Sequence, residues 1–550
     1  MPETASGWRG VLSRFFRVTL LQLVFAYGLL LAVHAFLGHW TPDYLQGRDL
    51  WHFMLTRMIV PMVMLGALAS LARLVPSALM LAAALLFAGT ISAIKRDATG
   101  EPFQMSDLFL AGQSTHLLNY VSWDRWLLGA FIIPASALYL WSLKFRRWSL
   151  PLLAVGVGLL STYRIEAVYK WIHDNSWWIG VEELTFSQAE SERMNGLATH
   201  LYFSTAGLML KTYGETEVSS AMEDLPMAPL VPPLAGPRPD IYVVLGEAWW
   251  RDPSDAQSPL DQLQGAGFAE GTAVSPVYGG TTPNAEFEVL TGIPVKSFRA
   301  GIIPYQHYLG YVTDKARTLP RLLSEQGYGT QAYHNFTRRF WLRDQIYPRF
   351  GFAHFTSMED MTLTVQDGQW PHDDGLYASV LKAAVDDKPQ FRFLVTVETH
   401  GPYGTMANDV KEHEGVSDYR GRLADAAKAL AAFKLDLDKK GRPYVVLAFG
   451  DHLPGLRHHQ WVNGIGTNDP RLHQVPFLVA SNTRAGDGLR QMLEGRPLFC
   501  FAPVLTQWLQ LGIADRYFRH QQKTCGDTPN VTELPSGPVI QNQLFSLKPI

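Results

Sequence analysis

Cysteine is scarce in this chain, whose 550 residues include only Cys500 and Cys525. Two cysteines are too few for a disulfide-built scaffold or a cysteine-rich zinc module, so a metal would have to be bound by oxygen and imidazole. An excess of one charge is also missing, because 47 Lys and Arg face 50 Asp and Glu. Proteins that bind nucleic acid generally do so through a basic surface, so this balance excludes nucleic acid as a partner. The near-average composition, 47% hydrophobic and 18% charged, excludes bulk disorder.

Long apolar runs, in contrast, are frequent in the first third of the chain. A run of about 20 apolar residues predicts a transmembrane helix, because only a helix satisfies its own backbone hydrogen bonds in hydrocarbon. Consecutive helices without a polar face would have no soluble shell in which to be buried. We therefore predict five spans, approximately at residues 18–37, 53–74, 77–94, 126–143 and 150–163.

The basic residues around these spans predict their orientation. Arginines between residues 9 and 17 precede the first span, and basic residues at 144–147 lie in the turn between the fourth and fifth. Short loops rich in Lys and Arg face the cytoplasm, so both segments are predicted inside. An odd number of spans then places the residues after 165 outside. Lys95 and Arg96 fall on the side that disagrees with this orientation.

The chain divides into three predicted regions. Residues 1–165 form the transmembrane domain, residues 166–239 form juxtamembrane helices and a linker, and residues 240–550 form an extracytoplasmic domain. The boundary is placed at 225–239, because the prolines there are too dense for a helix or a central strand.

The region after residue 240 alternates short β-branched runs with amphipathic stretches. Continuous apolar runs at 241–245, 393–397 and 444–449 predict buried strands. Residues 321–326 and 419–437 are typical of helices. Strands that alternate with helices predict an α/β sandwich with a mostly parallel sheet.

Polar side chains follow each of the three predicted strands. Glu247 follows the first, His400 comes after the second, and Asp451 and His452 follow the third. A single acidic residue at a strand end is more often a helix cap or turn former. In α/β folds, however, ligands gather beyond the carboxyl ends of the strands, which these residues share. Carboxylate and imidazole together are good ligands for Zn²⁺ or Mn²⁺, so the sequence predicts a metal site.

A hydroxyl group that a metal could activate is also present. Thr281 and Thr282 follow a pair of glycines and precede an apparent helix, with Pro283 suited to its first turn. One interpretation is that either threonine caps this helix. A helix N-terminus also attracts phosphate, so a threonine here could serve as a nucleophile.

Five short motifs, in this order, resemble the lipoteichoic acid synthase and phosphoglycerol transferase group of the alkaline phosphatase and sulfatase superfamily. The resemblance covers nearly the whole chain and implies a five-helix transmembrane domain followed by an extracytoplasmic alkaline phosphatase/sulfatase-like α/β sandwich. The motifs are Val-Leu-Gly-Glu at 244–247, Gly-Thr-Thr-Pro-Asn-Ala-Glu-Phe at 280–287, Phe-Trp-Leu-Arg-Asp at 340–344, Thr-His-Gly-Pro-Tyr at 399–403 and Phe-Gly-Asp-His at 449–452.

The resemblance also implies roles for individual residues. It implies that Glu247, Thr282, Asp451 and His452 hold a divalent metal, Mn²⁺ or Zn²⁺ with Mg²⁺ as a further option. Thr282 is then the nucleophile, because it matches the threonine five residues before the motif's Phe, and Thr281 is its rival.

Four further residues match the family's substrate site. Arg343 corresponds to a phosphate-binding arginine, with a structural pair to Asp344 as the alternative. His400 corresponds to a histidine that binds phosphate or moves a proton. Trp341 is expected to shape the head-group pocket and His334 to line the site, with core packing as the alternative for both.

The function implied by the resemblance is transfer of phosphoglycerol from phosphatidylglycerol to a glycan or glycolipid, through a phospho-threonine intermediate. The enzyme would be a multi-pass protein of the bacterial inner membrane with a periplasmic catalytic domain. Two alternatives stay open: a phosphoethanolamine transferase acting on lipid A or a related glycan, and a catalytically silent membrane-bound binding or regulatory protein. A formylglycine sulfatase is disfavoured, because neither cysteine lies in the required motif. Whether Cys500 and Cys525 form a disulfide is also left open.

Overall fold

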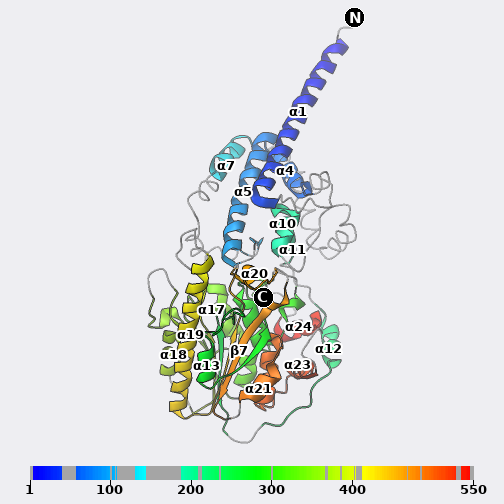
Figure 1. Ribbon diagram of the computed structural model, residues 1–550. Helices are drawn as coiled ribbons and strands as arrows, with labels where there is room; N and C mark the ends of the chain where they lie inside the picture. The colour runs from blue at the N-terminus through cyan, green and yellow to red at the C-terminus, as the bar shows by residue number, and fades with distance from the viewer. Residues whose placement is uncertain are drawn as a thin grey trace. The chain divides into compact units, whose positions relative to one another are not determined.

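The computed structural model divides the chain into two compact units. One comprises Met1–Met209 with Arg299–Gly301, and the other comprises Leu210–Phe298 with Ile302–Ile550 (Figure 1). The structure describes residues 4–39, 57–99, 102–105, 107, 131–143, 188–207, 213–233, 237–298, 302–365, 370–383, 387–401, 403, 412–456, 458–466, 469–483, 486–527 and 534–545.

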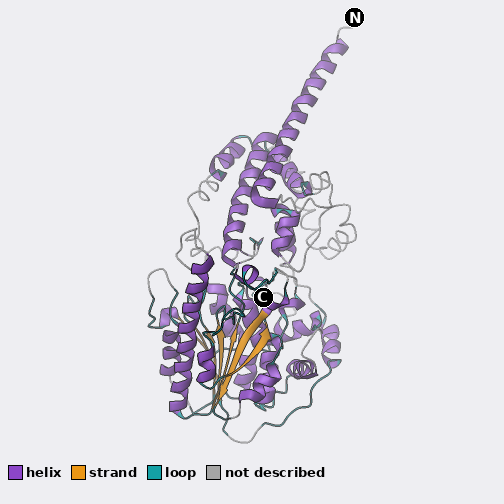
Figure 2. Ribbon diagram, in the orientation of Figure 1, coloured by secondary structure: helices purple, strands orange, loops and turns teal. Residues whose placement is uncertain are grey.

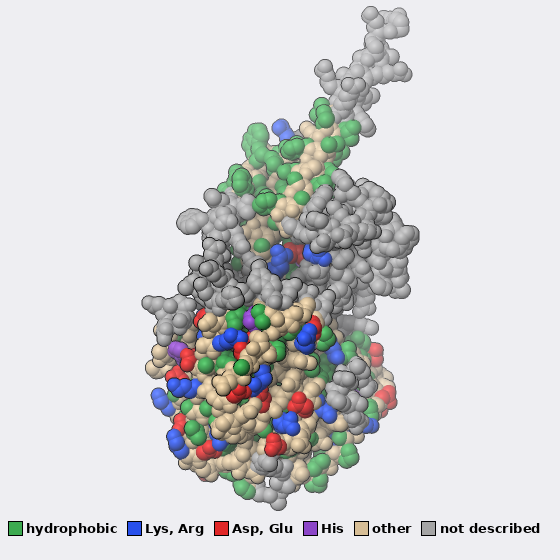
Figure 3. Space-filling model, viewed as in Figure 1, with side chains coloured by type: hydrophobic (Ala, Val, Ile, Leu, Met, Phe, Trp, Pro, Cys, Tyr) green, Lys and Arg blue, Asp and Glu red, His purple; other side chains and the backbone are tan. Residues whose placement is uncertain are grey.

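The first unit is helical, and hydrophobic side chains gather over its helices in Figure 3. Two of its helical segments, Val18–Leu37 and Leu74–Arg96, are long and apolar enough to cross a membrane. The predicted spans at 53–74 and 126–143 contain shorter apolar helices, and the predicted span at 150–163 lies outside the described residues. The helices are α1 (Thr4–His34), followed by a π-helical turn (Ala35–His39), α4 (Ile59–Leu71), α5 (Leu74–Thr99), α7 (Ile132–Trp141), α10 (Gln188–Asn195) and α11 (Leu197–Gly207).

The two cations that disagree with the predicted orientation are both paired in this unit. The Nζ atom of Lys95 lies 2.8 Å from Oδ2 of Asp107. The Nη1 atom of Arg96 lies 2.9 Å from Oε2 of Glu192, whose Oε1 accepts a hydrogen bond from Ser92.

The second unit contains a seven-stranded mixed sheet in the order β2-β7-β6-β1-β5-β3-β4. β1 pairs in parallel with β5 and β6, and β3 pairs in parallel with β4 and β5. β7 runs antiparallel to both β6 and β2. The mostly parallel sheet is therefore confirmed, and its antiparallel edge was not predicted. The strands are β1 (Asp240–Gly246), β2 (Ala269–Val274), β3 (Gly329–His334), β4 (His354–Ser357), β5 (Gln390–Val395), β6 (Tyr444–Gly450) and β7 (Gln474–Ser481).

Helices cover both faces of this sheet (Figure 2). α18 and α19 pack together on one side, and α21 to α24 lie on the other (Figure 1). The predicted helix at 419–437 lies within α19, and the one at 321–326 corresponds to α16. The helices are α12 (Glu215–Glu223), α13 (Asp261–Gly265), α14 (Thr282–Thr291), α15 (Pro304–His307), α16 (Leu319–Glu325), α17 (Arg343–Phe350), α18 (Asp373–Lys382), α19 (Glu412–Lys440), α20 (His458–Trp461), α21 (Gly486–Leu493), α22 (Phe501–Trp508), α23 (Arg516–Asp527) and α24 (Gly537–Leu544).

The central strands place their carboxyl ends at one edge of the sheet. β1 is buried on both faces, and its residues from 241 to 245 are at most 4% exposed, as expected for a strand inside an α/β sandwich. The register pairs Gly246 of β1 with Gly450 of β6. The residues that follow these two glycines, Glu247 and Asp451, therefore leave the sheet side by side.

A backbone hydrogen bond and a disulfide join segments of the second unit that lie outside the sheet. Residues 225–233 form neither helix nor strand, and the backbone N–H of Ala228 donates to the carbonyl of Arg519 at 2.9 Å. Cys500 and Cys525 form a disulfide, which settles the pairing that the sequence left open.

Candidate functional site

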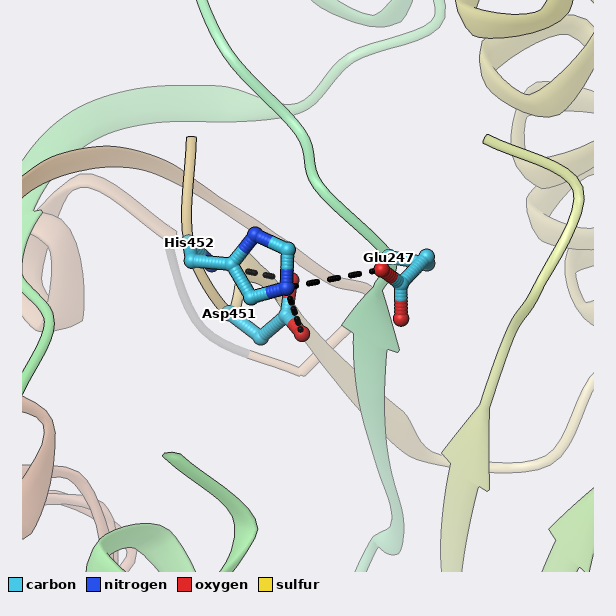
Figure 4. A group of neighbouring side chains, drawn as sticks. All are labelled: Glu247, Asp451 and His452. Atoms are coloured by element: carbon cyan, nitrogen blue, oxygen red, sulfur yellow. Dashed lines mark hydrogen bonds and ion pairs between the residues drawn. The ribbon is translucent and has the colours of Figure 1, made fainter. Parts of the chain in front are cut away.

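Glu247, Asp451 and His452 form a compact buried cluster beyond the ends of β1 and β6 (Figure 4). One ligand atom from each residue lies within 4.8 Å of the other two. The Nε2 atom of His452 is 3.5 Å from Oε1 of Glu247 and 3.3 Å from Oδ2 of Asp451. The side chains predicted to share a metal are thus brought together by two neighbouring strands.

The hydrogen bonds around this cluster leave one atom each of Asp451 and His452 available to a cation. Oδ1 of Asp451 accepts from the backbone N–H groups of Ala248 at 2.7 Å and His452 at 2.8 Å. Nδ1 of His452 lies 2.9 Å from the carbonyl of Leu453, which favours the tautomer with its proton on Nδ1. Nε2 of His452 and Oδ2 of Asp451 are buried and have no hydrogen-bond partner among the described residues. A lone pair that faces two carboxylates is favourable when a cation lies between them, so the residues fit a divalent metal.

Electrostatics also favours a cation here. Burial raises the pKa of the Glu247 carboxyl well above its usual range, and the neighbouring Asp451 carboxylate raises it further. Two carboxylates at this separation repel each other when both are ionised. A bound divalent cation would remove that repulsion and keep both groups deprotonated.

Thr282 is the first residue of α14 and lies against this cluster. Its hydroxyl donates to Oε2 of Glu247 at 3.3 Å, and the side chain is 6% exposed. Thr281 precedes the helix with a left-handed backbone (φ 65°), and its side chain makes no capping hydrogen bond to α14 in the described chain. The interpretation of Thr281 as a side-chain cap is therefore wrong. The geometry places the hydroxyl of Thr282 beside the predicted metal ligands.

Arg343 is bound to an acidic partner other than the one considered from sequence. It is 1% exposed, and its Nε lies 3.0 Å from Oε1 of Glu286, with a further bond from Nη2 to the same oxygen. The pair is between α17 and α14, which brings residues 57 positions apart into contact. The alternative of a pair with Asp344 is not formed. Glu286 holds the guanidinium charged and raises its pKa despite burial.

His334 lies behind Arg343, at the end of β3. Its Nδ1 donates to the carbonyl of Val395 at 2.9 Å, and its Nε2 accepts from Nη1 of Arg343 at 3.2 Å. Burial lowers the pKa of His334 well below its usual value, and the charge of Arg343 lowers it further. His334 is thus a neutral acceptor that supports Arg343.

His400 and Trp341 are both half-buried. Burial lowers the pKa of His400 to about 4, so it is neutral at pH 7, and its ring lies 4.5 Å from that of Trp370. Trp341 and Leu342 have left-handed backbones, each with φ 59°. Non-glycine residues rarely adopt this conformation, and it concentrates at functional sites.

Glu398, which also follows a strand, belongs to a different group. Its Oε2 accepts from the backbone of Asp373 at 2.8 Å, and its Oε1 lies 2.6 Å from Nδ1 of His372. Asp373 in turn accepts from Asn335 at 2.9 Å. This carboxylate therefore secures the start of α18 and lies outside the metal cluster.

Sequence reasoning missed the role of Glu286 together with Tyr305 and Tyr347. The hydroxyl of Tyr347 donates to Oε2 of Glu286 at 2.7 Å, and that of Tyr305 does so at 3.3 Å. A signal existed, because Glu286 is an acid between apolar residues four positions after Thr282. Its partners, distant in sequence, carried no such signal.

Comparison with known proteins agrees with this fold. Residues 239–495 match the sulfatase family. A putative cyclic β-1,2-glucan modification protein of Rhizobium meliloti is 28% identical over 475 residues, which cover 76% of this chain and 72% of that protein. Lipoteichoic acid synthase of Staphylococcus aureus is 29% identical over 160 residues, 26% of this chain and 24% of that protein, so the match spans about a quarter of this relative.

A solved structure shares the fold over most of the chain. The lipooligosaccharide phosphoethanolamine transferase A of Neisseria meningitidis superimposes with a TM-score of 0.54 at 14% identity, covering 91% of this chain and 98% of that protein. The predicted sulfatase-like α/β fold is thereby confirmed. The chain is therefore similar to the sulfatase family over residues 239–495 and to lipoteichoic acid synthase over about a quarter of its length.

Proposed function

We propose that this protein is a metal-dependent transferase that moves phosphoglycerol from phosphatidylglycerol to a glycan or glycolipid through Thr282. The observation that carries the proposal is the hydrogen bond from the Thr282 hydroxyl to Glu247, at the edge of a cluster that fits a divalent cation. Mn²⁺ or Zn²⁺ suits the carboxylate and imidazole ligands, and Mg²⁺ is a third option.

The apolar helices and one relative of the chain support the proposed donor and acceptor. Apolar helices long enough to cross a membrane favour a lipid donor, and the proposed arrangement is five spans in a bacterial inner membrane with a periplasmic catalytic domain. The relative from Rhizobium meliloti is named for modification of a glucan, which favours a glycan acceptor.

The proposed reaction has two displacements at phosphorus. In the first, Oγ1 of Thr282 forms a bond to phosphorus, the bond to the diacylglycerol oxygen breaks, and the threonine proton passes to the departing oxygen. In the second, an acceptor hydroxyl attacks phosphorus and its proton returns to Thr282 as the threonine oxygen leaves. A divalent cation held by Glu247, Asp451 and His452 would supply a lowered pKa for the hydroxyl of Thr282.

Three of the remaining site residues would act on the substrate directly, and the fourth, His334, would support Arg343. His400 is assigned to phosphate binding or proton transfer at the site. An N–H of Arg343 would meet a phosphoryl oxygen, where charge develops in the transition state. Trp341 would border the head group, and His334 would hold Arg343 in place.

The test is mass spectrometry of the purified protein after exposure to phosphatidylglycerol. We expect a phosphoglycerol adduct on the peptide containing residues 278–287, together with released diacylglycerol. Thr282→Ala should abolish both products, whereas Thr281→Ala should retain them. Phosphatidylethanolamine offered alone should give neither product, and an adduct of phosphoethanolamine mass would replace the proposed donor with this lipid. Undiminished turnover by Thr282→Ala would refute the nucleophile.

A further inference from the structure

Glu286 is a fully buried carboxylate on the helix that carries Thr282. It lies four residues after Thr282 in α14, so the two side chains emerge from the same face of the helix. The exposed fraction of Glu286 is 0%. A carboxylate in such a place is unfavourable unless it is paired and hydrogen-bonded, so its partners indicate its role.

Both oxygens of Glu286 are occupied by buried donors. Oε1 accepts from Nε and Nη2 of Arg343, and Oε2 accepts from the hydroxyls of Tyr347 and Tyr305. Two tyrosines on one oxygen fix the rotation of the carboxylate. That rotation in turn fixes the plane of the guanidinium on the other oxygen.

The hydrogen bonds of Arg343 leave little of its guanidinium for a substrate. Nε and one hydrogen of Nη2 go to Glu286, while Nη1 lies 3.2 Å from Nε2 of His334 and 3.2 Å from the carbonyl of Phe340. A guanidinium has five N–H groups, so one hydrogen on Nη2 remains. A phosphate would therefore meet a single N–H, whose direction is set by Glu286.

The same pair lies beside a strained turn. Trp341 and Leu342, directly before Arg343, both have φ 59°. Such a backbone persists only where its surroundings hold it. Arg343 supplies that hold, because its Nη1 bonds back across the turn to Phe340 while Glu286 anchors its other side.

We propose that Glu286 is a positioning residue that acts through Arg343, joining the nucleophile helix α14 to the turn at 340–343. It aims the remaining N–H of Arg343 at a phosphoryl oxygen and keeps Trp341 at the head group. This inference rests on the proposed function, because it requires a phosphodiester at Thr282.

The experiment compares Glu286→Gln with Glu288→Gln in the full-length protein, with phosphatidylglycerol as donor. Glu288 is a matched control, since it lies on the same helix and is 3% exposed. Its Oε1 accepts a hydrogen bond from the backbone N–H of Val295 rather than from Arg343. We expect Glu286→Gln to lower kcat by about 100-fold, as for loss of an aimed transition-state donor, and to raise KM. Glu288→Gln should stay within about threefold in kcat.

Two readouts separate positioning from loss of folded protein. A smaller folded fraction lowers the apparent kcat and leaves KM unchanged, whereas a misplaced Trp341 raises KM. In a double-mutant cycle, Arg343→Lys should cost much less in the Glu286→Gln background than alone, because both changes remove one function. Metal content should match the wild-type protein in each variant.

If Glu286→Gln fails to fold, Tyr347→Phe tests the same idea more gently. It removes one hydrogen bond to Glu286 and should lower kcat by roughly tenfold. Equal kinetics in Glu286→Gln and Glu288→Gln, or rate losses that simply multiply in the cycle, would overturn the inference while wild-type turnover stands. Absence of transfer by the wild-type protein would instead overturn the proposed function.

Discussion

His452 shows how a single side chain is prepared for a cation before any cation arrives. The carbonyl of Leu453 favours the proton on Nδ1, so the lone pair of Nε2 points at two carboxylates. Asp451 is held equally firmly, with Oδ1 bonded to two backbone N–H groups. Such outer contacts orient metal ligands and raise affinity.

Asp451→Asn should therefore lower the affinity for Mn²⁺ or Zn²⁺ by about 100-fold or more, because it replaces an anionic ligand with a neutral amide. The measurement is elemental analysis after dialysis against buffered free metal. Glu288→Gln, which also removes one buried carboxyl, should retain its metal. Equal metal loss in both variants would argue against the cluster as the binding site.

Glu288 itself gives a prediction for pH. Burial raises the pKa of this carboxyl to about 8, so the folded protein holds a proton that the unfolded chain has released above its ordinary value near 4.5. The resulting stabilisation is present at low pH and is lost as the pH rises toward 8, at a slope of about 1.4 kcal/mol per pH unit. Glu288→Gln should thus gain stability relative to wild type between pH 5 and pH 8. Thermal unfolding at both pH values checks this, and a constant difference would contradict it.

The residues of the site differ in how far the sequence could predict them. Glu247 and Asp451 were accessible, because each directly follows a continuous apolar strand. The pair of Glu286 and Arg343 was not, since it depends on a contact between segments 57 positions apart. A sequence motif identifies such residues but does not show which of them are in contact. The roles of all these residues stay predictions.

At the level of elements, α14 is held at both ends. Its first turn is fixed by Thr282 against Glu247, and its last turn ends in Gly292, whose φ of 68° suits a left-handed cap. The carbonyl of Gly292 accepts from Tyr517 at 2.8 Å and Gln521 at 2.9 Å, both on α23. The disulfide then ties α23 to the short helix Leu498–Cys500, which contacts α14.

Replacing Cys500 and Cys525 together by alanine should lower the free energy of unfolding by roughly 3 kcal/mol, because the bridge closes a 25-residue separation in the unfolded chain. Denaturant midpoints with and without reductant measure the change. Reductant should lower the midpoint of the wild-type protein and leave that of the double variant unchanged. A midpoint that ignores both treatments would contradict the prediction.

The strands also differ in how far the sequence could predict them. β1 and β6 were predicted because both are continuous apolar runs. β5 begins three residues earlier than the predicted strand at 393, since Gln390 and Arg392 break the apolar pattern although both are buried. Arg392 is accommodated by a hydrogen bond to the carbonyl of Val380, a long-range contact that no local pattern reveals.

At the scale of the whole molecule, the sequence predicts three regions, 1–165, 166–239 and 240–550, which stay predictions, whereas the structure divides the chain into two compact units. Two predicted spans correspond to segments long enough to cross a membrane, and the other three spans stay predictions. Length and hydropathy identify a span only when the helix is continuous, and helix ends depend on packing that a local window does not see.

The proposed orientation is testable with reporter fusions. A green fluorescent reporter fused after residue 145 should fluoresce, because that turn is predicted to face the cytoplasm. A secreted phosphatase reporter fused after residue 240 should be active, and each reporter should fail at the other position. Activity of the phosphatase at residue 145 would reverse the orientation.

The bridge between Cys500 and Cys525 has a consequence for when the enzyme becomes competent. Thiols stay reduced in the cytosol and are oxidised beyond the inner membrane. On the proposed orientation, this disulfide forms only after translocation. Until then α23, whose Tyr517 donates a hydrogen bond to the carbonyl of Gly292, is not covalently tied to the helix Leu498–Cys500. A copy that stays in the cytosol would lack this bridge, so under the proposed function the lipids of the inner leaflet would not meet a completed site.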